Sequence, residues 1–382
     1  MRKIIITLSI ILITILGYSQ KNNIEYQNGL KKLTSKDYKG AIADFTKSID
    51  KNKKNAKAYF NRGVANSELN NYHLAIDDFT QCLKLSPKEI NANFYRGKAN
   101  ANLYDFKAAI FDYNTAIKLN PKDKNIYIKR AEAYNALKDY IKSISDYDVA
   151  ISMDKSNIKL YYDRGLVYIN NNQQINAIED FDFIIAQNPF YKDVYLQRGH
   201  AKVEKLDYKG AINDYSEYIT FNPKNVTAYF FKGKTKMIIK DYKGAILDFD
   251  TALILTPNDV DILYLRAEAK IELKEKNMAL LDYDKIISIS PVYKDVYFKR
   301  ASLKSDLLDF NDAILDFTKA IENKPKDSNA FLGRGLAKIF AGFNIDGCED
   351  LKKASELGSE DANNKISEYC KSLNCKFTDD RN

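Results

Sequence analysis

The stretch AKAYFNRGVANSELNNYHLAIDDFTQCLKLSPKE, residues 56–89, decides the fold. Its Gly63 belongs to a series of ten small residues that recur every 34 residues, with no insertion or deletion between them. A fixed period of this length is typical of a solenoid, in which similar helical or strand units contact only their neighbours. The series consists of Gly29, Gly63, Gly97, Ala131, Gly165, Gly199, Gly233, Ala267, Ala301 and Gly335.

Three further positions keep the same spacing. Twelve residues after each small residue comes a second one such as Ala75, and four residues later comes a large ring such as Phe79, which only the last unit replaces, with Leu351. All seven prolines occupy one position of the unit. Because proline cannot continue a helix, they mark the boundary between one unit and the next. They are Pro87, Pro121, Pro189, Pro223, Pro257, Pro291 and Pro325.

The apolar residues within a unit have helical spacing. In residues 56–89, Phe60, Gly63 and Val64 share one stripe, and a second stripe runs through Ala75 and Phe79. A short polar break at residues 70–71 separates the two stripes. The pattern therefore predicts two helices of about a dozen residues joined by a tight turn.

The unit resembles the tetratricopeptide repeat, whose motif has an aromatic, a glycine, an alanine, an aromatic, an alanine and a proline at these spacings. The residues that carry the resemblance are Tyr59, Gly63, Ala65, Tyr72, Ala75, Phe79 and Pro87. It implies an all-α, right-handed superhelical solenoid of ten repeats, with the first helix of each repeat on the concave face. Lys53, Gly347 and Leu351 depart from the motif in the terminal repeats, which cap such stacks.

The constant 34-residue period, with the seven prolines near the ends of their units, predicts the organisation of the whole chain. We expect a secretory signal peptide at 1–19, ten repeats over 22–361, and a capping helix and tail at 362–382. The repeats are 22–55, 56–89, 90–123, 124–157, 158–191, 192–225, 226–259, 260–293, 294–327 and 328–361.

The first twenty residues differ from the rest. Arg2 and Lys3 precede an apolar run over residues 4–16, and small residues follow near Ser19. This pattern is typical of a secretory signal peptide, and the run is shorter than the ~20 residues of a membrane span. We expect cleavage after Ser19 and export to the periplasm or beyond, an uncleaved N-terminal anchor being the alternative.

Every repeat has an aspartate directly before the ring position, and eight repeats have an arginine directly before the first small residue. Repeat 1 has Asn28 at the arginine position, so a pair within that repeat would leave Asp44 without a cation. Counting charges therefore favours pairs between neighbouring repeats. The predicted pairs are Asp78–Arg96 and Asp112–Arg130. The alternative is that the arginines form a basic stripe for a ligand.

Three of the four cysteines lie near the C-terminus, and an exported chain can form disulfides. A Cys348–Cys370 bond would clamp a capping helix to the stack, and Cys370–Cys375 is the competing bond. With neither a histidine partner nor a fourth cysteine nearby, zinc is not expected.

No motif for catalysis or for a cofactor stands out. The two histidines, His73 and His200, have no nucleophile in a recognisable arrangement, and the sequence has no glycine-rich phosphate loop. The formal net charge of +8 comes from interleaved basic and acidic residues, without the continuous basic stripe that nucleic acids require. We therefore expect a non-enzymatic protein without cofactor or metal.

One set of residues points to a binding face. The residue after the first aromatic position resembles a groove position of the family, and it is apolar in all ten repeats. We call this set the aromatic ladder: Tyr26, Phe60, Phe94, Ile128, Tyr162, Leu196, Phe230, Tyr264, Phe298 and Leu332. We expect it to grip an extended or helical segment of a partner protein. The alternative, which involves no partner, is that these residues pack between adjacent first helices.

The sequence thus favours an exported scaffold for protein–protein interaction. Two other functions stay open: a structural spacer or self-associating envelope protein, and an envelope protein that stacks glycans on the same aromatic residues. The lysine–asparagine clamp of chaperone-binding family members is not reproduced, because Phe60, Val64, Phe94 and Lys98 stand at its positions.

Overall fold

The computed structural model describes residues 24–370, and every element in this range is a helix. The predicted all-α repeat solenoid is therefore confirmed. The signal peptide predicted at 1–19, the tail from residue 371 and Cys375 lie outside the described residues. The chain divides into two compact bodies, which we call the N-terminal body (Met1–Val194) and the C-terminal body (Tyr195–Asn382).

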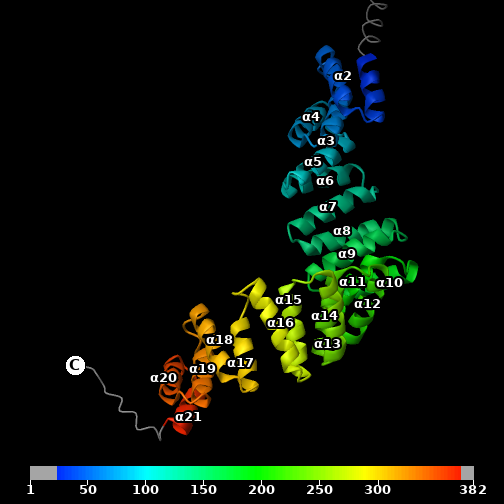
Figure 1. The fold of residues 1–382 in the computed structure, drawn as a ribbon. Coiled ribbons are helices and arrows are strands. Elements are labelled where there is room, and N and C mark those ends of the chain that lie inside the picture. Colours follow the sequence, from blue (N-terminus) through cyan, green and yellow to red (C-terminus); the bar gives the residue numbers. More distant parts are fainter. Residues whose placement is uncertain (1–23, 371–382) are drawn as a thin grey trace, which may run out of the picture. The chain divides into compact units, whose positions relative to one another are not determined.

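Each repeat contributes a pair of antiparallel helices, and successive pairs stack in chain order within each body (Figure 1). Residues 24–34 are the described part of the first helix of repeat 1. The later first helices are α3 (Ala56–Glu68), α5 (Ile90–Asn102), α7 (Lys124–Ala136), α9 (Ile158–Asn170), α11 (Lys192–Glu204), α13 (Val226–Ile238), α15 (Val260–Glu272), α17 (Val296–Asp306) and α19 (Ser328–Phe340). The second helices are α2 (Tyr38–Lys51), α4 (Tyr72–Leu85), α6 (Phe106–Leu119), α8 (Tyr140–Met153), α10 (Gln174–Gln187), α12 (Tyr208–Phe221), α14 (Tyr242–Leu255), α16 (Lys276–Ile289), α18 (Phe310–Asn323) and α20 (Asn344–Glu356).

The turn inside each repeat has one geometry. In repeat 2, Asn70 has a φ of 60°, and the next amide, Asn71 N, donates to the carbonyl of Asn66 at 2.9 Å. This is the left-handed ending that satisfies the last carbonyls of a helix. In several repeats the following aspartate caps the second helix, as Asp105 does by accepting from Ala108 N at 3.0 Å. Each repeat therefore makes this turn with the same number of residues, as the constant 34-residue period requires.

Small residues let the two helices of a repeat approach closely. A Cβ atom added to Gly63 would lie 2.8 Å from Cε1 of Phe79, and one added to Gly165 would lie 2.5 Å from Cε1 of Phe181. Each ring therefore packs directly on the backbone of the first helix. Ala75 is fully buried beside this contact. The Gly–ring contact joins residues that are 16 positions apart, so it lies within one repeat.

A last helix, α21 (Glu360–Tyr369), follows repeat 10. Cys348 on α20 is buried and forms a disulfide with Cys370, which directly follows α21. The two cysteines are separated by 22 positions, and closing a loop of this size in the unfolded chain corresponds to about 3 kcal/mol of stabilisation. The disulfide thus holds the end of α21 against the last repeat.

Candidate partner-binding face and buried charge clusters

The ten residues of the aromatic ladder are all half-buried. In six of the seven repeats with an aromatic ladder residue, its ring lies against the ring of the second helix in the same repeat. The ring centroids of Phe60 and Phe79 are 5.8 Å apart, and those of Phe298 and Phe317 are 5.7 Å apart. The ladder therefore contributes packing between helices and also keeps part of each side chain accessible.

Neighbouring repeats also meet through the residue that follows the ladder position, which the sequence analysis did not single out. Tyr95 lies edge-on to Phe60 of the preceding repeat, with centroids 5.7 Å apart. In the C-terminal body Phe231 lies edge-on to His200 at 4.4 Å. Two adjacent aromatic residues, as in Phe94–Tyr95 and Phe230–Phe231, were the available signal.

Part of the polar lining of the face is structural. The hydroxyl of Tyr215 lies 2.9 Å from Nδ1 of His200, and the hydroxyl of Tyr283 donates to Glu268. Burial lowers the pKa of His200 and raises the pKa of both tyrosines. Each of the four repeats with a tyrosine as its second-helix ring has a polar residue at this position of its first helix: Lys98, Glu132, His200 and Glu268. His200 and Glu268 thus support the ring beneath them and are not free groove ligands.

A cavity opens between the first helices α5 and α7 in the N-terminal body. Two small residues, Ala101 and Ala133, leave the space. Polar side chains stand around it, among them Lys98, Lys129 and Glu132. Lys129 pairs with Glu132 at 2.7 Å, whereas the ammonium of Lys98 lies over the rings of Phe94 and Tyr95, 6.0 and 5.2 Å from their centroids. The remaining lining residues are Asn102, Phe106 and Tyr113.

The predicted ion pairs Asp78–Arg96 and Asp112–Arg130 are wrong. Arg62 donates to Asp78 within repeat 2, with Nη2 2.7 Å from Oδ1, and Arg96 pairs with Asp112 at 2.6 Å. Arg130 likewise pairs with Asp146 of its own repeat. The signal was present in the sequence. Arginine and aspartate are 16 residues apart, as Gly63 and Phe79 are, so both pairs must form within one repeat.

In most repeats a further first-helix residue, one turn after the arginine position, also donates to the aspartate, and this position explains the error in repeat 1. Asp44 accepts from Lys32 at 2.8 Å, and Lys32 lies one turn after Asn28 on the same helix. In repeat 2 the equivalent residue is Asn66, whose amide donates to Asp78 at 3.0 Å. We call a second-helix aspartate with its two first-helix neighbours an aspartate clasp. Charge counting failed because it considered only one of the two first-helix positions.

The arginines also connect neighbouring repeats. Nη1 of Arg62 donates to Oγ1 of Thr46 on the preceding second helix at 3.0 Å, and Nη1 of Arg96 donates to Thr80 at 3.1 Å. In repeat 8 the acceptor is charged, because Nη1 of Arg266 lies 2.6 Å from Oδ1 of Asp250. With both ends engaged in this way, these arginines do not form a basic stripe for a ligand.

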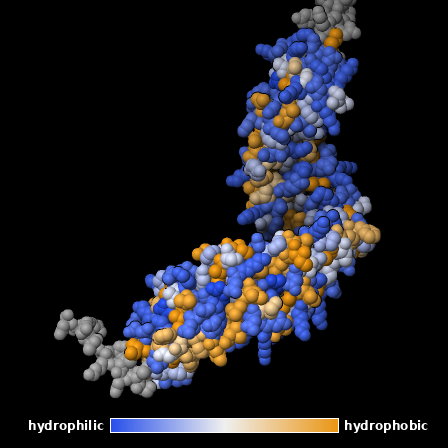
Figure 2. Space-filling view, in the orientation of Figure 1, coloured by the Kyte–Doolittle hydropathy of each residue, from blue (hydrophilic) through white to orange (hydrophobic). Residues whose placement is uncertain are grey.

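Exposed apolar residues also occur away from the ladder. Leu247, Leu281 and Leu315 occupy the same position on the second helices α14, α16 and α18, with 67%, 59% and 66% of their surface exposed. Apolar side chains interrupt the polar surface on both bodies (Figure 2). Across residues 24–370, no helix has both the length and the apolar character that a membrane crossing requires. No cluster of His, Cys, Asp and Glu in the same range could hold a metal ion.

Comparisons with known proteins agree with this geometry. Residues 56–89 and 91–123 each match a family model described as a tetratricopeptide repeat. The chain is a tetratricopeptide repeat protein. Repeats of this family support a role as a scaffold for protein–protein interaction. A search of curated proteins found no match.

Several solved structures are similar to the chain. MamA is 27% identical over 47% of this chain and 94% of that chain, with a TM-score of 0.42. A tetratricopeptide repeat protein from Parabacteroides merdae is 18% identical over 65% of this chain and 99% of its own, with a TM-score of 0.48. The C-terminal part of a tetratricopeptide repeat-containing protein from Cytophaga hutchinsonii is 18% identical to this chain. The match covers 71% of this chain and 97% of that one, with a TM-score of 0.49.

Proposed function

We propose that this tetratricopeptide repeat protein is an exported, non-enzymatic scaffold that binds a segment of a partner protein along its first helices. The cavity between α5 and α7 carries the proposal. Its lining combines Ala101, Phe106 and Ala133 with the polar side chains Lys98 and Asn102 and the Lys129–Glu132 pair. A concave site that combines apolar side chains with polar groups able to fix an orientation is the usual setting for a bound ligand or side chain.

The location of the protein is part of the proposal. Residues 1–19 have the charged, apolar and small-residue regions of a signal peptide. The Cys348–Cys370 disulfide suits an oxidising compartment, because cytosolic thiols are normally kept reduced. We therefore place the function in the periplasm or the outer part of the cell envelope.

The test compares variants of the cavity in the full chain. Changing Lys98 and Lys129 to Glu reverses two charges of the cavity lining and changes no residue of the ladder or of the aspartate clasps. The matched control changes Lys107 and Lys118, which are exposed on α6 outside the cavity lining, to Glu. Each bait is used for affinity capture from a native envelope extract, and circular dichroism verifies that its helices are intact.

Capture by the unaltered chain and by the control, but not by K98E/K129E, supports groove binding at this cavity. Equal capture by all three baits contradicts it. Absence of any protein partner favours the spacer, and retention on a cell-wall glycan fraction favours glycan recognition. Ser substitutions in the ladder are a poorer test, because Phe230, Tyr264 and Phe298 are half-buried and also pack on neighbouring rings.

A further inference from the structure

The junction between repeats 8 and 9 departs from the regular repeat. Helix α17 has 11 residues, whereas the complete first helices on either side, α15 and α19, have 13. Lys294, just before α17, has a φ of 46°. The other non-glycine residues with positive φ in the described chain all lie in the turn inside a repeat. A lysine in the left-handed region is unfavourable by roughly 1–2 kcal/mol, so another interaction must hold it there.

The local sequence does not impose this conformation. Tyr293–Tyr297 reads Tyr-Lys-Asp-Val-Tyr, and the same five residues occur at Tyr191–Tyr195, three repeats earlier. At the earlier site Lys192 is the first residue of helix α11. The same pentapeptide thus begins a regular helix in one place and forms an irregular turn in the other. The cause of the difference must lie in the surroundings of Lys294.

Those surroundings are a cage for a cation. The ammonium of Lys294 lies 4.8 Å from the ring centroid of Tyr264 and 4.6 Å from that of Tyr293, and it donates to Asp261 at 2.9 Å. The two rings are 5.9 Å apart at 67°. Two aromatic faces and a carboxylate around one ammonium form a typical cation–π site.

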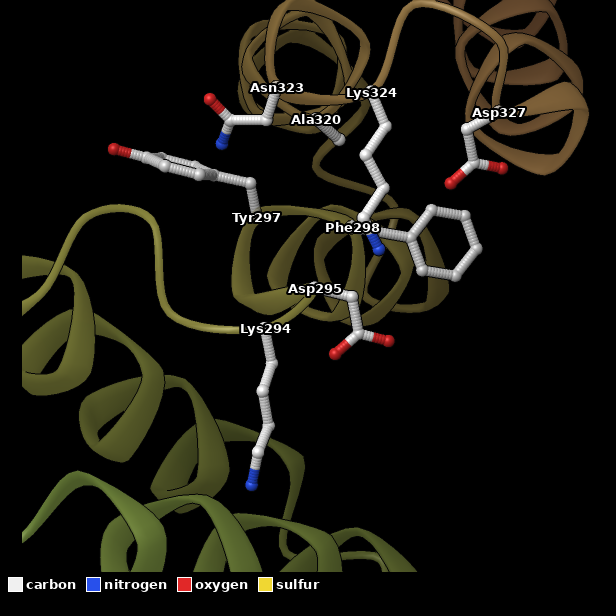
Figure 3. Close-up of a pocket in the computed structure, with 8 residues that line it drawn as sticks. All are labelled: Lys294, Asp295, Tyr297, Phe298, Ala320, Asn323, Lys324 and Asp327. Atoms are coloured by element: carbon white, nitrogen blue, oxygen red, sulfur yellow. The ribbon is translucent and has the colours of Figure 1, made fainter.

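The hydroxyl groups fix both rings in place. Tyr293 donates to Asp261, and Tyr264 donates to Oδ1 of Asp295 at 2.9 Å. Asp295 precedes α17 at the position of an N-cap, yet its side chain makes no capping hydrogen bond. Lys294 and Asp295 help to line a small cavity, and in Figure 3 the ammonium of Lys294 points away from the other lining residues Lys324 and Asp327.

Without the ammonium of Lys294, the cage would have an unbalanced negative charge. Asp261 and Asp295 would face it with two tyrosine rings, while the nearby Glu268 is already paired with Lys299 at 3.1 Å. Lys294 and Asp261 are both accessible, with 47% and 59% of their side chains exposed. An incoming cation can therefore reach the site and displace the lysine without unfolding a helix.

We propose that Tyr264, Tyr293 and Asp261 form a binding site for a lysine side chain of the partner segment, and that Lys294 occupies this site until the partner arrives. The inference rests on the proposed function, because Tyr264 belongs to the aromatic ladder along which the partner would lie. While Lys294 occupies the site, a partner lysine can bind only the molecules in which the cage is free. The apparent association constant is therefore the intrinsic one multiplied by that free fraction.

The test uses a small probe in place of the natural partner. The full chain and its Lys294→Asn variant are titrated with the capped tripeptide acetyl-Gly-Lys-Gly-amide, and the methyl signals of Val292 and Val296 report binding by NMR. Asparagine tolerates the left-handed region, so K294N empties the cage without adding backbone strain. We expect K294N to bind the tripeptide at least tenfold more tightly than the unaltered chain, and the same peptide with norleucine not to bind.

Two further variants verify the site. Asp261→Asn in the K294N background should weaken binding several-fold, and Asp261 is exposed, so the fold should not depend on it. The matched control, Tyr162→Leu with Tyr191→Leu, removes a similar ring pair 5.4 Å apart in the N-terminal body, where Lys159 occupies the position equivalent to Asp261. This control, made in the K294N background, should leave the affinity unchanged.

The proposal is contradicted if the unaltered chain and K294N bind the tripeptide with equal affinity. It is also contradicted if the norleucine peptide binds as well as the lysine peptide, or if no variant binds the tripeptide. These results do not affect the groove proposal, which the capture experiment with K98E/K129E tests at a different pair of repeats. Conversely, if the capture experiment fails, the tripeptide titration still tests the cage, because it needs no natural partner.

Discussion

The aspartate clasps of repeats 2 and 8 hold the same carboxylate in different ways. In repeat 2, Asp78 has one cation, Arg62, and a neutral donor, Asn66. In repeat 8, Asp282 has two cations, Arg266 and Lys270, and Arg266 also pairs with Asp250 on the preceding second helix. Each cluster is therefore electrically balanced, the first with one charge of each sign and the second with two.

The comparison teaches that two repeats can build the buried cluster from different residues and reach a balanced charge in both. Asp78 and Asp282 are both buried, with 4% and 3% of their surface exposed. An unpaired charge at such a depth is costly, whereas a paired and hydrogen-bonded one is tolerated. Substitutions that unbalance a cluster should therefore cost more than substitutions that exchange one balanced set for another.

The largest effect should come from removing the aspartates. Asp282→Asn leaves two cations with only Asp250, and we expect a loss of about 3–5 kcal/mol, the range for breaking a buried ion pair. Asp78→Asn leaves one arginine that still donates to Thr46, and we expect about 1.5–3 kcal/mol. Hydrogen exchange followed by mass spectrometry measures each loss locally, on peptides from α15–α16 and from α3–α4. Equal losses would contradict the comparison.

A smaller effect should follow when Lys270 is changed to Asn and Asp250 to Thr, which gives repeat 8 the balanced set of repeat 2. Asp282 keeps both hydrogen bonds from Arg266, so we expect a loss of only about 1 kcal/mol. The same exchange measurement applies, with Lys274→Asn in the adjoining turn as the control. A loss as large as that of D282N would show that Lys270, and not Arg266, is the main counter-ion.

Repeat 7 offers a stabilising change. Lys232 stands there in place of arginine, 3.3 Å from Asp248, and Lys236 adds a second cation, so the cluster has two positive charges and one negative. Replacing Lys232 with Arg and Ser216 with Asp reproduces the set of repeat 8. We expect a gain of about 1 kcal/mol, seen as slower exchange in α13 and α14. Slower exchange in S216D alone, equal to that of the double variant, would assign the gain to charge and not to guanidinium geometry.

The smallest effect concerns pH. Burial raises the pKa of Asp78, and Arg62 and Asn66 oppose this shift. A folded pKa above the unfolded value means that the folded state binds the proton first, so this group's contribution to stability declines as pH rises from 3.8 through the folded pKa. Asn66→Lys should lower the pKa of Asp78 and reduce this decline. Exchange in α3–α4 across this pH range measures it, and an unchanged slope in N66K would contradict the assignment.

The regular parts of this fold could be predicted from the sequence, because the signal there is repeated ten times. The Gly63–Phe79 contact and the helix pair around it follow from a constant spacing and the sizes of the residues. The lysines and asparagines that complete the clasps could not be predicted by counting charges, because Lys32, Asn66 and Lys270 share a position and not a charge. Lys294 also could not be predicted, because its pentapeptide has two conformations in one chain.

The placement of the clasp inside a single repeat bears on how such a chain can grow. Had the arginine and aspartate belonged to neighbouring repeats, gaining or losing one repeat would join partners that had not been selected together. Because the pair lies within 17 consecutive residues, an internal duplication copies a complete cluster. Only one hydrogen bond per arginine, such as that from Arg62 to Thr46, then has to find a new acceptor. Threonine, asparagine and aspartate all serve there, so the number of repeats can change by recombination without leaving a buried charge unpaired.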